Sequence, residues 1–430
     1  MQTEAKLSYV GKLRLFKKDA RFYIASGGTR AFAWGMSNVV FNLYLLRIPG
    51  VEEDFLGFFL SMSMFAMAAM GVLAGMASDR WCRKNMLLVF STVANIATAI
   101  QYITINTIGL IATQIVLGLS FAFQQVAWTP YITDLSTSQE RAHLFGFSSG
   151  ISLLTIFFGN LIGGFLPGVF DTLFSLGGNI LTAYRFTLWV SLIPLFTGTL
   201  LIIPMSRDRP TPRKFKFGFA NVKNARFIGQ YTAVVSIVGL GAGMIVMFFN
   251  VFFEAVFSAD SALIGVIFAI NTILLSSGNF LAPALADRIG KVRTIVVTEA
   301  LSIPFLLMLW WSPNIYIGVL GYVSRNVLMN MAGPVNNAFY MEGLAKGERA
   351  TAMGITSTGD SLVRAIAANI GGLLLAAGLY REPYLLVSGL YILGIILFFA
   401  FFRNKEREIS LVQLADITRG DEANVSPDIT

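Results

Sequence analysis

The chain has 430 residues, of which 55% are hydrophobic and only 13% are charged, and its formal net charge is +8. Soluble proteins carry about 25% charged residues, so this composition excludes soluble globular and disordered proteins, and a single cysteine excludes a disulfide scaffold. The single histidine leaves little room for a zinc site. We therefore expect no metal, and we also expect no cofactor. We expect no nucleic-acid partner, because the positive charges flank apolar segments. The composition predicts a protein that crosses a lipid bilayer many times.

Apolar runs predict twelve membrane-spanning helices. Taken in chain order, they cover residues 20–46, 54–77, 86–105, 108–131, 143–166, 185–204, 227–254, 261–285, 294–311, 314–340, 351–377 and 383–402. The first run is too long for a signal peptide, so we interpret it as an uncleaved span. The expected parts are a cytoplasmic N-terminal tail (1–19), a six-helix bundle (20–204), a basic linker (205–226), a second six-helix bundle (227–402) and a polar, disordered tail (403–430).

Most lysines and arginines outside the predicted spans lie on one side of the membrane in this topology. They gather in the N-terminal tail, in the linker and in every second loop, whereas the opposite loops hold only Arg47 and Arg381, with Arg185 at a span end. Positive loops lie on the cytoplasmic side. We therefore expect both termini to be cytoplasmic, and a multi-pass protein of the cell membrane.

The two predicted bundles repeat one another. Identical or similar residues recur 208 positions apart, which is unexpected by chance at a single spacing. The matching pairs are Asn42 and Asn250, Gly57 and Gly265, Asp79-Arg80 and Asp287-Arg288, Asp134 and Glu342, Glu140-Arg141-Ala142 and Glu348-Arg349-Ala350, Gly146 and Gly354, and Gly163-Gly164 and Gly371-Gly372. The sequence therefore predicts two six-helix copies of one topology, an arrangement known from transporters.

The loop after the second span carries the most specific motif. Residues 75–84 read GMASDRWCRK and residues 283–291 read PALADRIGK. These residues resemble the pattern Gly-x-x-x-Asp-Arg-x-Gly-Arg-Arg of the major facilitator superfamily, over about residues 20–402. Cys82 and Pro283 stand where that family prefers glycine. The resemblance implies an all-α fold of twelve spans, with spans 1, 4, 7 and 10 around a central cavity, and transport by alternating access.

The resemblance also implies a charged latch at the cytoplasmic ends of the helices. Carboxylates there pair with guanidinium groups and helix N-termini in one conformation and release them in the other. The candidate gating residues are Asp79, Arg80, Arg83, Asp134, Arg141, Asp287, Arg288, Glu342 and Arg349. The alternative is that these loops only anchor the chain in the membrane.

Four charged residues lie near the middle of predicted spans, where a charge costs about 2.5–3.5 kcal/mol and therefore indicates function. Asp360 and Arg364 are one helical turn apart, so they form either an ion pair or a proton-coupling site. Arg30 and Arg325 have no acid at this spacing. They either bind an anionic group of the substrate or cap backbone carbonyls at a helix break. Glu299 is an alternative protonation site, on a span that usually faces lipid in the superfamily.

Polar and aromatic residues on the cavity-lining spans complete the candidate substrate site. With Arg30 and Arg325, they are Trp34, Asn38, Asn42, Gln124, Trp128 and Asn250. Trp34, Asn38 and Asn42 recur every four residues and so lie on one helix face. The aromatic rings offer stacking surfaces, although ordinary packing between helices is the alternative.

We expect a monomeric secondary transporter for a small organic solute, anionic or amphiphilic. An ion gradient, for which protons are one candidate, or the substrate gradient itself would drive it. A multidrug or metabolite efflux antiporter is the alternative, although Gln114 replaces an arginine, and residues 159–164 lack a proline, that exporters of this family carry. A sensor or lipid scramblase on the same fold is an alternative of another class. The sequence carries no nucleotide-binding loop and no serine-nucleophile motif, so we expect no enzyme.

Overall fold

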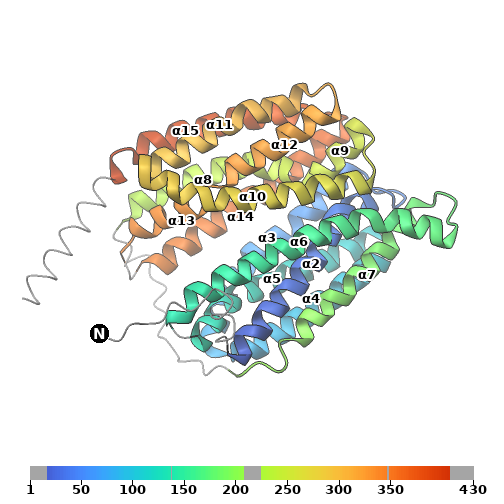
Figure 1. The fold of residues 1–430 in the computed structure, drawn as a ribbon, viewed down its shortest axis with the longest axis horizontal. Helices are drawn as coiled ribbons and strands as arrows, with labels where there is room; N and C mark the ends of the chain where they lie inside the picture. Colours follow the sequence, from blue (N-terminus) through green and yellow to red (C-terminus); the bar gives the residue numbers. More distant parts are fainter. Residues whose placement is uncertain (1–16, 137, 208–223, 346–347, 407–430) are drawn as a thin grey trace, which may run out of the picture. The chain divides into compact units, whose positions relative to one another are not determined.

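The computed structural model describes residues 17–136, 138–207, 224–345 and 348–406, and every regular element within them is helical (Figure 1). Most of the two predicted tails and of the predicted linker lies outside these residues. In the first half of the chain, the helices are α2 (Lys18–Leu45), α3 (Glu53–Arg80), α4 (Arg83–Ile103), α5 (Thr107–Leu135), α6 (Ser138–Phe174) and α7 (Ile180–Leu200). The bounds of α2, α3 and α4 lie within three residues of the predicted runs. Helix α5 ends four residues later than predicted, α6 is longer at both ends, and α7 begins five residues and ends four residues earlier.

Two predicted spans of the second half are each broken into two helices. The second half contains α8 (Ala225–Ile245), the 3-10 turn η2 (Val246–Phe248), α9 (Phe249–Phe257), α10 (Ser261–Ile289), α11 (Lys291–Trp311), α12 (Ile315–Asn330), α13 (Gly333–Glu342), α14 (Arg349–Ala376) and α15 (Glu382–Phe402). The predicted run 227–254 is one apolar segment, Ala225–Phe257, that contains a 3-10 turn. The predicted run 314–340 is interrupted after Asn330.

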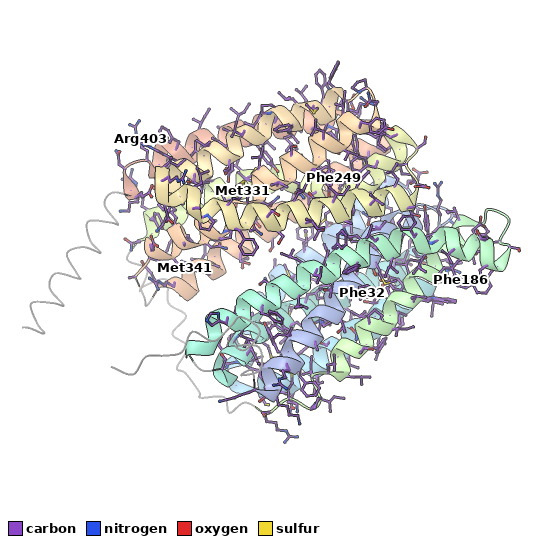
Figure 2. The ribbon with its side chains drawn as sticks, viewed as in Figure 1. Phe32, Phe186, Phe249, Met331, Met341 and Arg403 are labelled. Atoms are coloured by element: carbon purple, nitrogen blue, oxygen red, sulfur yellow. The ribbon has the colours of Figure 1, made fainter. Side chains whose placement is uncertain are left out.

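Each break has an identifiable physical cause. Pro334 follows Gly333 at the start of α13, and proline lacks an N–H and clashes with the preceding turn. Figure 2 labels Met331 at this break. At η2, the Asn42 side chain donates a 2.6 Å hydrogen bond to the Met247 carbonyl. A side chain inserted in this way takes the place of a helical bond and bends the helix.

The repeat extends to helix boundaries. Glu53 and Ser261 begin α3 and α10, and α4 and α11 both begin and end 208 residues apart. Helix caps recur as well. Asn106 accepts a hydrogen bond from the Ile108 amide at the start of α5, and Asn314 accepts one from Ile317 at the start of α12. Both caps satisfy an amide that the helix itself leaves without a partner.

Ten helical segments of the described residues are long and apolar enough to cross a membrane. The predicted spans at 20–46 and 314–340 are not among them. These two segments hold five of the eight predicted substrate-site residues, including Arg30 and Arg325, and the second is broken into two short helices. The polar content that made them functional candidates also lowers their hydropathy.

Contacts between residues divide the chain into two compact units. Unit 1 comprises residues 1–216, 243–273 and 364–380, and unit 2 comprises 217–242, 274–363 and 381–430. Unit 1 thus joins the first half of the chain with segments of the second. The predicted division into two six-helix bundles at 205–226 stays a prediction.

Glycines bring α2 and α6 together in unit 1. A Cβ at Gly159 would lie 2.4 Å from the Phe32 carbonyl oxygen, and a Cβ at Gly163 would lie 2.5 Å from the Cα of Met36. Gly35 faces the backbone of α6 in the same way. Small residues allow such close packing of membrane helices, and the two helices run side by side in Figure 1.

Aromatic rings fill the core of unit 2. Tyr231 of α8 stacks on Tyr340 of α13 with ring centroids 3.8 Å apart. Phe227 packs edge-on against Phe339 and Phe402. Helices α11, α12 and α15 pack side by side in this unit (Figure 1).

Candidate functional site

Arg30 lies inside unit 1, where α2, α4 and α5 meet. One guanidinium nitrogen donates a 2.7 Å hydrogen bond to Ser91 Oγ, and the other donates to Gln124 Oε1. Ser91 also donates to Gln124 Oε1 at 3.1 Å. Ser91 and Gln124 are buried, whereas Arg30 is half-buried. Both partners are neutral, so these contacts leave the positive charge of Arg30 uncompensated by any carboxylate of the described residues.

Two features of α2 and its neighbours hold Arg30 in place. The Arg30 stem passes Gly198 of α7 so closely that a Cβ there would lie 2.4 Å from Arg30 Cγ. One turn before Arg30, Ser26 donates a 2.6 Å hydrogen bond to the Gly198 carbonyl. Gly198 is therefore needed for space, because any larger residue would displace the arginine.

An aromatic wall stands beside Arg30. Its guanidinium carbon lies 5.7 Å from the centroid of the Trp128 ring, and Trp128 stacks on Tyr23 at 4.8 Å. A cation over an indole face is attracted by the ring electrons. Gln124 and Trp128 were predicted as partners in a site with Arg30, whereas Ser91 and Tyr23 were not predicted.

The other predicted residues of α2 lie elsewhere along the helix. Trp34 is 58% exposed, and Asn38 is half-buried. Asn42 donates a 3.0 Å hydrogen bond to Asn250 Oδ1 of α9. Asn250 in turn donates to the carbonyls of Val39 and Asn38 at 3.1 and 3.4 Å. The structure thus pairs the two asparagines with each other, at repeat-equivalent positions, rather than with Arg30.

We refer to the end of unit 1 where α2 leads into α3 as the α2–α3 end. Here, residues of the first half of the chain contact residues of the second half. Arg47 and Glu254 form an ion pair at 2.6 Å. Tyr380 donates a 2.6 Å hydrogen bond to Glu53 Oε1. Burial, followed by the contact with Glu53, raises the pKa of Tyr380 to about 12, so the hydroxyl stays protonated and able to donate at neutral pH.

Two glycine pairs at the α2–α3 end obey the repeat. A Cβ at Gly57 would lie 2.7 Å from the Cα of Gly372, and a Cβ at Gly164 would lie 2.9 Å from the Cα of Gly265. Gly57 and Gly265 are repeat mates, and so are Gly164 and Gly372. Each contact therefore joins the same two repeat positions, one from each copy, and the two contacts differ only in which copy supplies which position.

A groove of about 690 Å³ lies in unit 1, between α6, α7 and the start of α10. Its lining is mainly apolar and includes Phe165, Leu173 and Ile180, with Asp171 and Asp260 at its edge. None of the predicted site residues lines this groove, so it is separate from the contacts around Arg30.

Arg325 lies in unit 2 and is only 1% exposed. It donates to the Tyr391 hydroxyl of α15 and, at 3.4 Å, to Asn326 Oδ1. Its guanidinium carbon also lies 5.4 Å from the Tyr391 ring centroid. Substrate contact by Arg325 stays a prediction.

Asp360 and Arg364 lie one turn apart on α14, on either side of the division between the units. Their pairing and the proposed proton coupling at Asp360 stay predictions.

The predicted latch residues are placed only in part. The side chains of Asp79, Asp134 and Arg141 lie outside what the structure describes. Arg80, Asp287 and Arg288 are exposed at helix ends. Arg83 Nε donates to Ser78 Oγ at 3.4 Å, and Arg349 Nε donates to the Leu344 carbonyl at 3.3 Å.

Glu342 pairs with a residue that was not predicted. Lys291 Nζ lies 2.6 Å from Glu342 Oε1, which joins the start of α11 to the end of α13. Lys291 and Glu342 lie 208 residues after Arg83 and Asp134, which were both candidate gating residues. This correspondence was the sequence signal that could have identified Lys291. Nearby, the Glu406 carboxylate accepts from the amides of Lys291 and Val292, a favourable contact at a helix N-terminus.

Comparison with known families identifies the chain. The sequence model of the Major Facilitator Superfamily matches residues 24–368 and 231–416. The chain belongs to the major facilitator superfamily. This family and the similar solved structures indicate a transporter and not an enzyme. No curated protein sequence matches the chain at a significant level.

Solved structures of the superfamily share its fold at low sequence identity. A mutant of the nucleoside transporter NupG has a TM-score of 0.74 and 12% identity, over 90% of this chain and 100% of that one. A bacterial homologue of the human lysosomal transporter Spinster, in an inward-facing and occupied conformation, has a TM-score of 0.73 and 14% identity, over 89% and 96%. The human organic anion transporter MFSD10 has a TM-score of 0.62 and 15% identity, over 89% and 99%.

Proposed function

We propose that this superfamily member is a secondary transporter for a small organic anion, which binds at Arg30. The observation that carries the proposal is the set of contacts around Arg30, which holds the guanidinium between neutral groups. A guanidinium held by two neutral acceptors keeps its full charge and its fork geometry for a carboxylate or phosphate. Ser91 and Gln124 orient the arginine without neutralising it.

The aromatic wall formed by Trp128 and Tyr23 favours a particular class of anion. Trp128 offers a flat apolar ring next to the charge, and the buried Tyr23 stacks against that ring. An aromatic or amphiphilic anion would gain both contacts, because the ring stacks while the charged group meets the guanidinium. One of the similar structures bears the name of an organic anion transporter, which agrees with this class.

The wider transport scheme is also a proposal. It comprises twelve spans with both termini in the cytoplasm of a cell membrane, a monomeric carrier and alternating access. Positive charge in alternate loops supports the orientation. The symmetric glycine contacts at the α2–α3 end support a reversible closure, since smooth surfaces without side chains separate and rejoin with little rearrangement.

The test is binding of a matched ligand pair, an aromatic carboxylate and its primary amide, to the purified full chain. Arg30→Gln should weaken carboxylate binding by about 10- to 150-fold, because a charged hydrogen bond contributes roughly 1.5–3 kcal/mol. The amide should lose much less.

Arg185→Gln is the matched control, because Arg185 also lies in unit 1 and contacts an aromatic residue, Tyr44. It should leave the preference for the carboxylate unchanged. Equal losses for both ligands in Arg30→Gln, or no loss for either, would remove the anion site.

A further inference from the structure

Glu299 is a carboxyl group in the middle of a membrane-spanning helix. It lies eight residues after the start of α11, or about 12 Å along the axis, and about 18 Å from the other end at Trp311. No other residue between Thr294 and Trp311 has an ionisable side chain. Such a position places the carboxyl near the depth of the membrane centre.

Glu299 lies on the packed side of α11. The buried residues of this helix recur at spacings of three and four, and Glu299 falls among them; they are Ile295, Thr298, Ser302, Leu306 and Leu309, each at most 2% exposed. Val297 and Leu301, on the other side, are 42% and 53% exposed. Glu299 is itself half-buried. The family-based expectation that this span faces lipid therefore does not hold for this residue.

The repeat gives an independent reason to regard this position as functional. Ser91 of α4 lies 208 residues before Glu299, on a helix whose ends match those of α11. Ser91 is fully buried and bonds to both Arg30 and Gln124. The same position therefore points into the polar interior in the first copy and carries an acid in the second.

The Glu299 carboxyl makes no hydrogen bond or ion pair with any residue that the structure describes. The charged groups on the helices packed against α11 have partners of their own, since Arg325 bonds to Tyr391 and Glu342 to Lys291. Other ionisable groups of unit 2 are the buried hydroxyls of Tyr231, Tyr322, Tyr340 and Tyr384 and the Asp360 carboxyl. Glu299 and Asp360 both interact electrostatically with the Tyr231 hydroxyl. An isolated carboxylate inside a membrane is costly, and the group becomes neutral by taking up a proton.

We propose that Glu299 is a proton-binding site of this transporter. The carboxylate takes a proton from water on one side of the membrane to become the neutral acid, and returns it to water on the other side. Its use in coupling rests on the proposed transport function, whereas its occupancy by a proton does not. Asp360 is the rival site from the sequence.

The first experiment needs no substrate. Dicyclohexylcarbodiimide reacts with protonated carboxyl groups in apolar surroundings, and mass spectrometry of the digested protein locates the adduct. The full chain in liposomes should carry an adduct on Glu299 whose yield falls between pH 6 and pH 9. The adduct should persist in Asp360→Asn and be lost in Glu299→Gln. No adduct on Glu299, or a yield that is constant over this range, would overturn the proposal.

The second experiment tests coupling. Uptake of the aromatic carboxylate into proteoliposomes is compared with and without a gradient of one pH unit, which can raise accumulation up to about tenfold for one proton carried. Glu299→Asp should keep the response and Glu299→Gln should lose it. A full response in folded Glu299→Gln would overturn the coupling role. If the wild-type chain takes up no anion, the proposed function fails, while the labelling result still decides the proton site.

Discussion

The two arginines that looked alike in the sequence have different surroundings in the structure. Arg30 is half-buried among neutral groups in unit 1, whereas Arg325 is 1% exposed and bonded to Tyr391 in unit 2. A buried arginine that loses its partners is costly to a fold. We therefore propose that Arg325 mainly stabilises the contact between α12 and α15.

Arg325→Gln should lower the melting temperature of the purified protein more than Arg30→Gln does. The lost charged hydrogen bond corresponds to about 1.5–3 kcal/mol. Tyr391→Phe should reproduce part of the loss, since it removes the same bond from the other side. If Arg325→Gln melts like the wild type but no longer binds the aromatic carboxylate, the sequence-based assignment to the substrate is correct instead.

The pair formed by Lys291 and Glu342 should behave as a unit. Lys291→Glu and Glu342→Lys should each destabilise the protein, and the double variant should recover at least half of the loss, because the exchange restores opposite charges. Both side chains are about one-third exposed, so the coupling should be at most about 1 kcal/mol. A double-mutant cycle on thermal unfolding measures it. Arg288→Glu, at an exposed position on α10, is the control and should change stability little.

At the scale of helices, the close approach of α2 and α6 depends on particular glycines and not on glycine content. A Cβ at Gly163 would lie 2.5 Å from the Met36 backbone, whereas a Cβ at Gly168, on the same helix, would meet nothing within 4 Å. Backbone atoms cannot move aside as the end of a side chain can.

Gly163→Ala should therefore destabilise the protein by about 1–3 kcal/mol, the usual cost of overpacking. Gly168→Ala should be neutral or stabilising by up to about 1 kcal/mol, since alanine favours helix. Thermal unfolding of both variants in the same detergent makes the comparison. Equal effects would show that the helices adjust more easily than their contacts indicate.

Sequence reasoning succeeded where a signal was local or periodic. Apolar runs placed the helices, and the 208-residue repeat anticipated the matching ends of α4 and α11. It failed where the answer depended on a residue far away in the chain. The break at η2 has no proline and involves a bond from Asn42, about two hundred residues earlier.

The sequence also could not predict which residues bond to the charged side chains. Ser91 carries no signal of its own, yet it orients Arg30. Tyr391 looked like an ordinary aromatic residue of the last span. Only the packing of α12 and α15 on the same helix, α11, brings it next to Arg325. The sequence named Glu342 but not its partner Lys291, because several cations in the same loops have suitable spacing.

At the scale of the whole molecule, the contacts at the α2–α3 end must open if the proposed alternating access is correct. A short bifunctional thiol reagent should link Arg47→Cys to Glu254→Cys, in a background with Cys82→Ser, because the native side chains meet at 2.6 Å. The linked protein should stop transporting, and reduction of a cleavable linker should restore transport.

The control is a pair within the first half of the chain, Asn95→Cys with Thr199→Cys, whose native side chains bond at 2.9 Å. Linking these two should leave the transport rate close to that of the unlinked variant. Full transport by the protein linked at 47 and 254 would show that the α2–α3 end stays closed throughout the cycle.

The uncompensated charge of Arg30 has an electrical consequence. A guanidinium cannot lose its proton at any physiological pH. If the proposed anion site is correct, an empty carrier with Glu299 in its neutral, protonated form presents one fixed positive charge there, and a bound monovalent anion cancels it. Movement of one charge through the full membrane potential is worth about 2.3 kcal/mol per 100 mV. Voltage would therefore act mainly on the return of the empty carrier and little on the loaded one. The cell's resting potential would then set how quickly the carrier becomes available for its next substrate.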